Sequence, residues 1–526
     1  MDALAQRHPL RLTNTLTRSK EAFEPLAPPA VGLYVCGPTV YGDPHLGHAR
    51  SAVTFDLLTR YLRHLGYTVR YVRNITDVGH LQDEALEQGE DKIARKARLE
   101  KLEPMEVAQR YTNRYHDGMD ALNCLRPSIE PTASGHIPEQ IAVIRELIAK
   151  GFAYESCGSV YFDLGAYSEK HTYGTLSGKV LEELQADTRG TAGQQEKRHP
   201  FDFALWKKAE PSHIMRWDSP WGEGFPGWHI ECTAMSTKYL GETFDIHGGG
   251  LDLQFPHHEA EIAQSCGAHG HGPARLWMHH NMVTMDGAKM SKSAGNFVTL
   301  DELFTGSNPI LERAYRPMAV RFLMLQSHYQ SPIDFSNAAL QAAEKGLDRL
   351  LQAVELLAGM ADEPETDASE RGDAQRDEVR ALSLPAPEVG TPLETELVEA
   401  CHACYAALSD DLNTAQAVAA MFELSTKINA LHNRQLDPGH VSAPVLRWVR
   451  GTVEGLVYGV LGLKLEKGGP SGKVDGLLDL ILELRAQARG ARDFRTSDRI
   501  RDALAALGFR IKDVKGGGTE VEFEGG

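Results

Sequence analysis

The chain has 526 residues, of which 42 % are hydrophobic and 24 % charged, a composition typical of a globular protein with several domains. Its net charge of −17 by itself disfavours a nucleic-acid partner, and no apolar run approaches the roughly 18 residues of a membrane span. The seven cysteines are irregularly spaced, unlike a disulfide framework, and residues 1–26 lack the apolar stretch of a signal peptide. We therefore expect a cytoplasmic protein without a membrane partner.

The first elements predict a doubly wound sheet. Loose alternation over residues 10–26 indicates a short hairpin, and the apolar run 31–36 indicates a buried strand. Apolar residues then recur at helical spacing over 46–65, and residues 68–75 form a second strand-like run. A strand, a helix and a strand with so long a crossover predict a parallel pair in an α/β, Rossmann-like fold.

Ligands of such sheets bind beyond the carboxyl ends of the strands. Cys36 ends the first strand, Thr76 follows the second, and His45 and His48 lie in the first turn of the intervening helix. Topology alone therefore predicts that these four side chains share one site.

The rest of the chain divides by composition. Residues 1–125 and 226–300 are expected to form the two halves of the α/β domain, and 126–225 an inserted subdomain with many Gly, Pro and aromatic residues. Helical patterns predict helical regions over 301–345 and 346–466, the latter with a loose acidic loop at 361–393. Residues 473–526 form a small basic module, in which Arg485, Arg489, Arg492, Arg495, Arg499, Arg501, Arg510 and Lys512 lie between Lys473 and Lys515. From the spacing alone this basic stripe is either a solvated helix face or an RNA contact.

Two short strings suggest phosphate chemistry. Residues 45–48 read His-Leu-Gly-His at a helix start, where unpaired N–H groups and imidazoles can donate to phosphoryl oxygens. Residues 289–293 read Lys-Met-Ser-Lys-Ser in a loop flanked by glycines, where Lys289 and Lys292 can neutralise charge on leaving pyrophosphate. The first string alone is most often a pair of surface histidines.

His257 and Glu261 stand four residues apart at the start of a predicted helix, so their side chains share a face and could bind one metal. Alone, this pair is a weak signal. It also differs from the His-Glu-x-x-His pattern of zinc proteases, because no second histidine follows at the required spacing.

In this order, the two strings resemble the signature pair of class I aminoacyl-tRNA synthetases. Residues 34–41, 227–232 and 255–259 further resemble cysteinyl-tRNA synthetases, and the resemblance extends over essentially the whole chain. It implies that cysteine is activated with ATP and Mg²⁺ to cysteinyl-adenylate and then transferred to the 3′ end of tRNA(Cys). It also implies that His45, His48, Lys289 and Lys292 are catalytic.

The same resemblance implies one Zn²⁺ per chain, which selects the substrate thiolate. Further residues follow from it. Thr76 and Trp228 would line the cysteine pocket, whereas His247 and Asp252, with His45, His48 and Lys292, would bind ATP; the zinc ligands would be Cys36, Cys232, His257 and Glu261. A metal that binds thiolate far better than hydroxyl separates cysteine from serine, which pocket shape alone does poorly.

The resemblance assigns the tRNA to the last third of the chain, with 301–345 contacting its stem, 346–466 binding it and 473–526 reading its anticodon. We expect a monomer. The segment Asp77-Val78-Gly79-His80 departs from the family pattern, and residues 89–93 are expected to supply its equivalent. Cys401 and Cys404 form a Cys-x-x-Cys within a predicted helix, where core packing is the expected role.

Two other functions share these motifs. A ligase that joins cysteine to an amino sugar would keep every active-site residue, but it would not need the roughly 180 residues after 345. A tRNA-binding paralogue without catalysis is disfavoured by the intact histidine, lysine and zinc-ligand positions.

Overall fold

A computed structural model describes residues 3–79, 81–83, 88–179, 196–210, 213–290, 295–361, 387–465, 480–489, 493–506, 509–513 and 519–523. The chain forms two compact units, Met1–Lys464 and Leu465–Gly526, which are described separately. Within the described residues, no helix has the length and apolar character needed to cross a bilayer.

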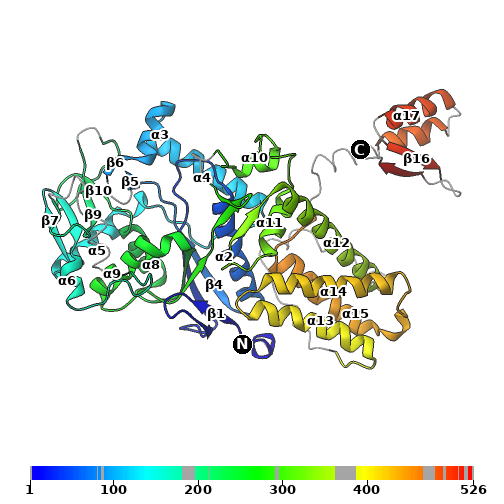
Figure 1. Ribbon diagram of the computed structural model, residues 1–526, viewed down its shortest axis with the longest axis horizontal. Coiled ribbons are helices and arrows are strands. Elements are labelled where there is room, and N and C mark those ends of the chain that lie inside the picture. The colour runs from blue at the N-terminus through cyan, green and yellow to red at the C-terminus, as the bar shows by residue number, and fades with distance from the viewer. Residues whose placement is uncertain are drawn as a thin grey trace. The chain divides into compact units, whose positions relative to one another are not determined.

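The centre of the first unit is a parallel sheet with the strand order β12-β11-β3-β4 (Figure 1). Its strands are β3 (Ala30–Val35), β4 (Thr68–Arg73), β11 (Phe244–Gly250) and β12 (Ala274–His280). The expected parallel pair is confirmed as β3 and β4, which pair from Ala30 opposite Thr68 to Val35 opposite Arg73. The second strand is shorter than predicted, since it ends at Arg73.

Two helices cover this sheet. α2 (Leu46–His64) packs on β4, β11 and β12, and α8 (Ile230–Leu240) packs on β3 and β4. The chain leaves β3 toward β4 after α2 and returns to the other side of β3 after α8. Right-handed crossovers in opposite directions place such helices on opposite faces, which is the doubly wound arrangement predicted from the sequence.

The region predicted as an insertion contains an antiparallel sheet of order β10-β9-β8-β7. The strands are β7 (Ala153–Ser156), β8 (Ser159–Phe162), β9 (Phe203–Lys208) and β10 (Gly224–Pro226). Helices η1 (Ser134–His136), α5 (Ile137–Ala149) and α6 (Leu164–Ser168) accompany it. Before it lie β5 (Leu81–Asp83), β6 (Gln88–Asp91), α3 (Lys92–Glu100) and α4 (Pro104–Ala121).

After β11, the chain forms η3 (Leu251–Leu253), η4 (Gln254–His258) and α9 (Glu259–His269). A small sheet of order β14-β13-β15 follows, built from β13 (Val283–Met285), β14 (Ala288–Lys289) and β15 (Ile333–Phe335).

The helical part consists of α10 (Leu300–Thr305), α11 (Pro317–Leu325), α12 (Asn337–Ala361), α13 (Pro392–Ser409), α14 (Thr414–His432), η7 (Pro438–His440), α15 (Ala443–Glu454) and η8 (Gly455–Val460). Cys401 and Cys404 are buried in α13, as expected. Most of the acidic segment 361–393 lies outside the described residues.

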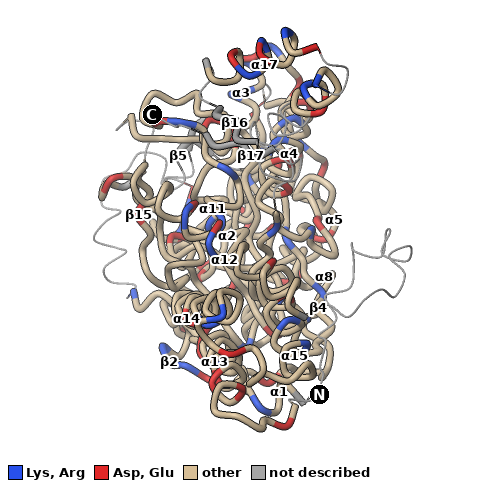
Figure 2. Tube along the Cα trace, turned by 90° about the vertical axis from the view of Figure 1, so that its right-hand side faces the viewer, with Lys and Arg blue, Asp and Glu red and all other residues tan. Residues whose placement is uncertain are grey.

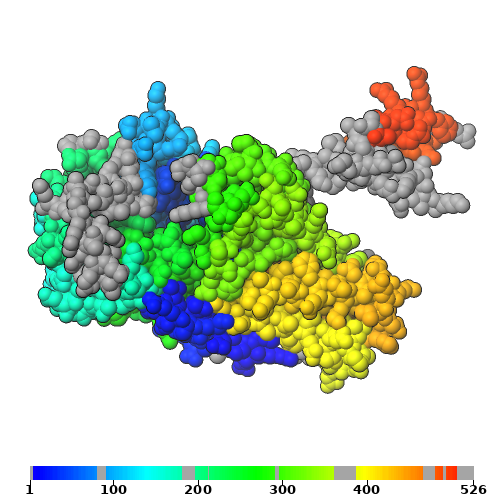
Figure 3. All heavy atoms as spheres, in the orientation of Figure 1, coloured from blue at the N-terminus to red at the C-terminus, as the bar shows by residue number. Residues whose placement is uncertain are grey.

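The N-terminal segment joins the α/β part to the helices. It comprises α1 (Ala3–Arg7) and the predicted hairpin, which is confirmed as β1 (Arg11–Asn14) paired with β2 (Ser19–Ala22). Thr13 donates its backbone N–H to Asp411 at 2.8 Å, and Lys20 forms an ion pair with Asp410 at 2.7 Å. Figure 3 shows this blue segment against the yellow helices.

A buried ion-pair cluster makes a second connection between these parts. The Asp56 carboxylate on α2 binds Arg60 at 2.8 Å and Arg321 on α11 at 2.5 Å. Arg321 is fully buried, and its guanidinium also donates to the carbonyl of Leu461 at 2.7 Å. Because a buried charge without partners is costly, this network fixes α2 against the helical part.

The second unit contains a helical segment at 480–489, α17 (Phe494–Ala506) and the hairpin β16 (Phe509–Asp513) with β17 (Thr519–Phe523). Basic and acidic residues alternate along α17 (Figure 2). Arg501 in this helix pairs with Asp498 and Asp502. The predicted basic stripe differs in one member, since Arg485 is buried, while Arg489 is exposed.

Candidate active site and metal centre

A cavity of about 720 Å³ opens at the carboxyl ends of the parallel strands. Residues at or just beyond the ends of all four strands line it, namely Cys36, Asn74, Gly250 and His280. This position matches the expectation for doubly wound sheets, where ligands bind at the point at which the strand order reverses. Eight of the predicted site residues also line the cavity: Cys36, His45, His48, Thr76, Trp228, Cys232, Asp252 and His257.

His45 and His48 form the start of α2. His45 is the N-cap residue, and its Nδ1 accepts the Gly47 backbone N–H at 3.1 Å, while Nδ1 of His48 accepts the N–H of His45 at 3.3 Å. With each Nδ1 acting as an acceptor, the neutral rings carry their protons on Nε2. Burial and the neighbouring His45 lower the pKa of His48 well below its usual value. The two rings are therefore neutral donors at a helix N-terminus, an arrangement suited to phosphate.

Because glycine has no side chain, Gly47 lets a ligand approach the backbone closely. It also has a second role. A Cβ atom at Gly47 would lie 2.9 Å from Cε1 of His45. The missing side chain thus leaves room for the ring that caps the helix.

The lysine-containing loop is only partly described. Lys289 ends β14, nothing is described of its side chain, and the predicted catalytic Lys292 lies outside the described residues. Met290 and Phe297, on either side of the segment 291–294, line the same cavity as the two histidines.

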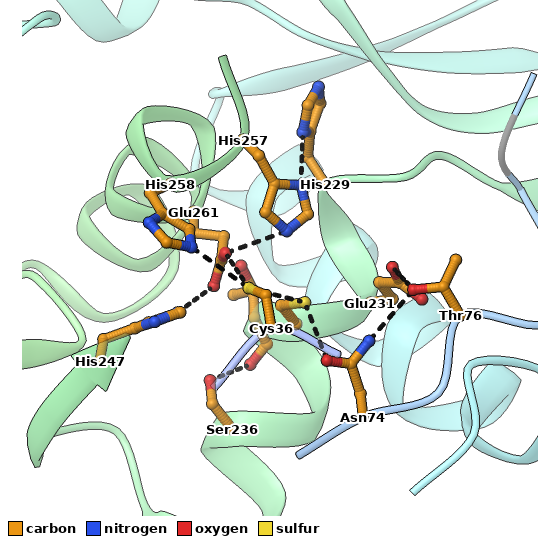
Figure 4. Close-up of polar contacts among 12 residues, drawn as sticks. Cys36, Asn74, Thr76, His229, Glu231, Ser236, His247, His257, His258 and Glu261 are labelled. Carbon is orange, nitrogen blue, oxygen red and sulfur yellow. Dashed lines mark hydrogen bonds and ion pairs between the residues drawn. The ribbon is translucent and has the colours of Figure 1, made fainter. Parts of the chain in front are cut away.

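Four candidate metal ligands meet in the site: Cys36, Cys232, His257 and Glu261. Figure 4 shows Cys36, His257 and Glu261 pointing toward one another. Their ligand atoms all lie within 4.8 Å of one another. The Sγ atoms of Cys36 and Cys232 are 3.7 Å apart, and Cys36 Sγ lies 3.6 Å from Oε1 of Glu261. His257 Nε2 lies 3.2 Å from the same Glu261 oxygen, as the spacing of four residues predicts. The structure thus brings together residues that are up to 225 positions apart.

The donor set fits zinc. Two sulfurs each about 2.3 Å from a tetrahedral zinc ion lie about 3.8 Å apart, close to the 3.7 Å between the two cysteines. Without a metal, burial raises the pKa of Cys36 well above its usual value and that of Cys232 to about 12. A divalent cation would supply the positive charge that two thiolates need here.

A set of histidines lies around these ligands. His247 Nε2 donates to Oε2 of Glu261 at 2.8 Å, and Nδ1 of His257 lies 3.1 Å from Nδ1 of His229. His258 Nε2 lies 3.2 Å from Cys36 Sγ, so Cys36, His247, His258 and Glu261 form a second possible ligand group that overlaps the first. Burial lowers the pKa of His258 well below its usual value, which keeps that ring neutral. The sequence did not single out His258 or His229, although both lie in strings quoted for the resemblance.

His247 differs from its expected placement. It was expected to face the adenosine of ATP, but it is fully buried under the metal ligands and stacks on Trp277 with ring centroids 4.4 Å apart. The reason is its position in β11, opposite Tyr34 of β3, which directs the ring to Glu261. Asp252, from the same string, does line the cavity.

Trp228 and Thr76, the two residues expected in the cysteine pocket, contribute an aromatic ring and a hydroxyl group. Trp228 stacks on His257 with ring centroids 4.5 Å apart. Thr76 donates its hydroxyl to Glu231 at 2.6 Å, and both residues line the cavity. Burial raises the pKa of Glu231 well above its usual value. Glu231 is a second residue that the sequence did not single out, although it directly precedes Cys232.

The segment that departs from the family pattern is held by hydrogen bonds as far as Gly79. Asp77 accepts the backbone N–H of Ser134 at 2.8 Å, and Gly79 donates its N–H to Asp91 at 2.9 Å. His80 lies outside the described residues. Residues 89–93 were expected to replace the family segment that is missing after Asp77. Lys92, one of these residues, lines the cavity.

Comparison with known proteins agrees with this arrangement. Residues 22–345 match the family model of the tRNA synthetases class I (C) catalytic domain, and residues 403–466 match the DALR domain. Similar structures include Mycobacterium tuberculosis methionyl-tRNA synthetase bound by methionyl-adenylate, with a TM-score of 0.54 and 14 % identity over 89 % of this chain and 96 % of that one. Thermus thermophilus arginyl-tRNA synthetase gives a TM-score of 0.50 and 15 % identity, over 89 % and 86 % of the two chains. At these identities the likeness shows the fold.

The curated relatives are much closer in sequence. The cysteine–tRNA ligase of Porphyromonas gingivalis is 55 % identical over 513 residues, 97 % of this chain and 98 % of that protein. The cysteine–tRNA ligase of Thermus thermophilus is 50 % identical over 515 residues, with the same coverage. These matches include the residues after 345, which an amino-sugar ligase would not need. The chain therefore belongs to the class I aminoacyl-tRNA synthetases, within the family of cysteine–tRNA ligases.

Proposed function

We propose that this cysteine–tRNA ligase selects its amino acid through one Zn²⁺ held by Cys36, Cys232, His257 and Glu261. The observation that carries the proposal is the convergence of two sulfurs, one imidazole nitrogen and one carboxylate oxygen within 4.8 Å, with three of the four residues lining the cavity. Bound there, zinc would accept the substrate thiolate and reject serine, because a hydroxyl is a far poorer zinc ligand.

The remaining residues bind and orient the two substrates. Trp228 forms a wall of the cysteine pocket beside His257, and Asp252 faces the adenosine part of ATP with its Mg²⁺. The Nε2–H groups of His45 and His48 donate to phosphate oxygens, and Lys289 and Lys292 stabilise the charge that passes to pyrophosphate. The cysteine carboxylate attacks the α-phosphate of ATP, and the terminal ribose hydroxyl of tRNA(Cys) then takes the cysteinyl group. No side chain has to become a covalent nucleophile.

We further propose that the enzyme acts as a monomer in the cytoplasm. The seven cysteines all lie in the described part of the chain as free thiols, which suits a reducing compartment. The helices after residue 345 and the basic C-terminal module would bind tRNA(Cys), with the anticodon read by residues 473–526.

A zinc measurement tests the ligand set. Cys232→Ser should lower bound zinc and the preference for cysteine over serine together, because it removes one of the two thiolates. Metal content by mass spectrometry and amino-acid-dependent ATP–pyrophosphate exchange measure the two effects. Cys157→Ser, at an exposed cysteine, is the matched control and should change neither. Full zinc occupancy in Cys232→Ser would refute the ligand set.

A second assay tests the acceptor. Purified enzyme should catalyse cysteine-dependent exchange and should also charge tRNA(Cys). Exchange without charging would favour a small-molecule acceptor such as an amino sugar.

A further inference from the structure

Among the described residues, one of the two oxygens of a buried carboxylate in the site has no hydrogen-bond partner. Glu231, in the first turn of α8, is 2 % exposed and lines the cavity. Its Oε1 accepts the Thr76 hydroxyl at 2.6 Å. Within the described residues, no donor reaches its Oε2, which is also buried. A buried polar atom without a hydrogen bond is costly, so Oε2 requires a donor from the cavity.

The surrounding hydrogen bonds fix Glu231 as an acceptor. The backbone N–H of Gly37 donates to Oδ1 of Asn74 at 2.9 Å, which leaves the amide Nδ2 as the other end of that side chain. This Nδ2 donates to Thr76 Oγ1 at 3.2 Å, and Thr76 in turn donates to Glu231. Each donor in this series is directed toward the carboxylate, and Figure 4 shows the contacts from Asn74 through Thr76 to Glu231. An ionised carboxylate only accepts hydrogen bonds, so the missing partner of Oε2 in the ionised Glu231 is a hydrogen-bond donor.

Glu231 lines the same cavity as the proposed metal ligands Cys36, Cys232 and His257. It directly precedes the metal ligand Cys232, whose Sγ lies 3.8 Å from Oδ1 of Asn74, in the same series of contacts. In free cysteine, only two carbon atoms separate the sulfur from the amino nitrogen. A thiolate held at the metal site thus brings the α-ammonium group, with three N–H donors and a positive charge, near this carboxylate.

The other carboxylates that line the cavity are less suitable. Asp43 already forms an ion pair with Arg114, and Asp252 is exposed on η3. Glu231 is the buried one, where an ion pair gains most from the exclusion of water.

We propose that Glu231 binds the α-ammonium group of cysteine through Oε2, and that it is a specificity-determining residue of the reaction. Glu231 thereby fixes the second of two points on the substrate, while the metal site fixes the sulfur. The proposal rests on the proposed function. It predicts a preference for free α-amino thiols over thiols without the amino group.

Binding of two ligands to two proteins tests this. L-cysteine and 3-mercaptopropionate, which lacks the amino group, are titrated into zinc-loaded full-length enzyme and into Glu231→Gln, with tryptophan fluorescence as the readout. A hydrogen bond to a charged group contributes about 1.5–3 kcal/mol, so the Kd for cysteine should rise roughly 10- to 150-fold in the variant. The Kd for 3-mercaptopropionate should stay within about twofold. Glu242→Gln, at an exposed carboxylate, is the control and should change neither value.

The other outcomes overturn the proposal. An equal loss for both ligands would mean that Glu231 only maintains the pocket, and no loss for either would mean that it does not touch the amine. If Glu231→Gln does not fold, the two Kd values of the wild-type enzyme test the proposal. A Kd for 3-mercaptopropionate equal to that for cysteine would contradict it. Failure of the zinc assignment is distinguishable, since the wild-type enzyme would then bind no 3-mercaptopropionate and would contain no zinc.

Discussion

At the scale of single residues, neighbouring side chains orient the candidate metal ligands. Glu261 is oriented by His247, whose Nε2 lies 2.8 Å from Oε2 of the carboxylate. His257 contacts the other oxygen of Glu261 through Nε2 and His229 through Nδ1. Hydrogen bonds of this kind set the direction of a ligand and contribute to metal affinity without contact with the metal.

His247→Ala should therefore weaken zinc binding although the four proposed ligands remain. Loss of such an orienting hydrogen bond typically costs about 10- to 100-fold in metal affinity. Competition with a chromogenic chelator measures the Kd for zinc. His271→Ala, at a half-exposed histidine, is the control. An unchanged zinc affinity in His247→Ala would show that Glu261 does not depend on this contact.

At the scale of elements, the glycines of β11 allow the close packing on which the site depends. A Cβ atom at Gly248 would lie 2.1 Å from Cε1 of Phe55 on α2, and one at Gly249 would lie 2.7 Å from Cε1 of His258. Gly37, just after β3, has no room either, since its Cβ would lie 1.7 Å from the carbonyl oxygen of Asn74. Helix and sheet therefore approach one another more closely here than side chains would permit.

Gly248→Ala should destabilise the first unit by about 1–3 kcal/mol, the usual cost of an extra methyl group in a packed core. Urea unfolding followed by circular dichroism gives the free energy of unfolding. Gly272→Ala is the control, because a Cβ there meets no atom within 4 Å, and its free energy should stay within about 0.5 kcal/mol of the wild type. Equal stability of the two variants would mean that α2 can shift away from β11 at little cost.

Element-level prediction worked where the signal was local. The periodicity of residues 46–65 located α2, and the apolar run before Cys36 located β3 to within one residue. The ring of His247 could not be placed in this way. Its direction depends on the pairing of β11 with β3, more than 200 residues earlier, and no local pattern encodes that pairing. Glu231 escaped notice for the same reason, because its role depends on Thr76, 155 residues away.

At the scale of the whole molecule, the chain divides into two compact units after Lys464. The described cavity, the candidate metal ligands and the helical part all belong to the first unit. The second unit carries exposed arginines at 489, 495, 499 and 501 on an otherwise acidic protein, as an RNA contact requires.

A chain ending at Lys464 should accordingly retain cysteine-dependent ATP–pyrophosphate exchange, since cysteine and ATP need only the first unit. Its charging of tRNA(Cys) should fall by about tenfold or more, equivalent to at least about 1.4 kcal/mol of lost tRNA interaction. Exchange and charging assays on the same preparation separate the two effects. Full charging activity in the shortened chain would show that the second unit does not contribute to tRNA recognition.

The wide separation of the metal ligands along the chain also has a consequence during synthesis. Cys36 leaves the ribosome 225 residues before Glu261, a delay of about 10 to 45 s at ordinary elongation rates. For most of that interval Cys36 has neither the Glu261 carboxylate nor the strand β11, whose Gly248 carbonyl accepts its backbone N–H. The nascent enzyme thus depends on the reducing state of its surroundings before its candidate metal ligands can meet. Oxidative stress should harm molecules in the course of synthesis more than finished ones.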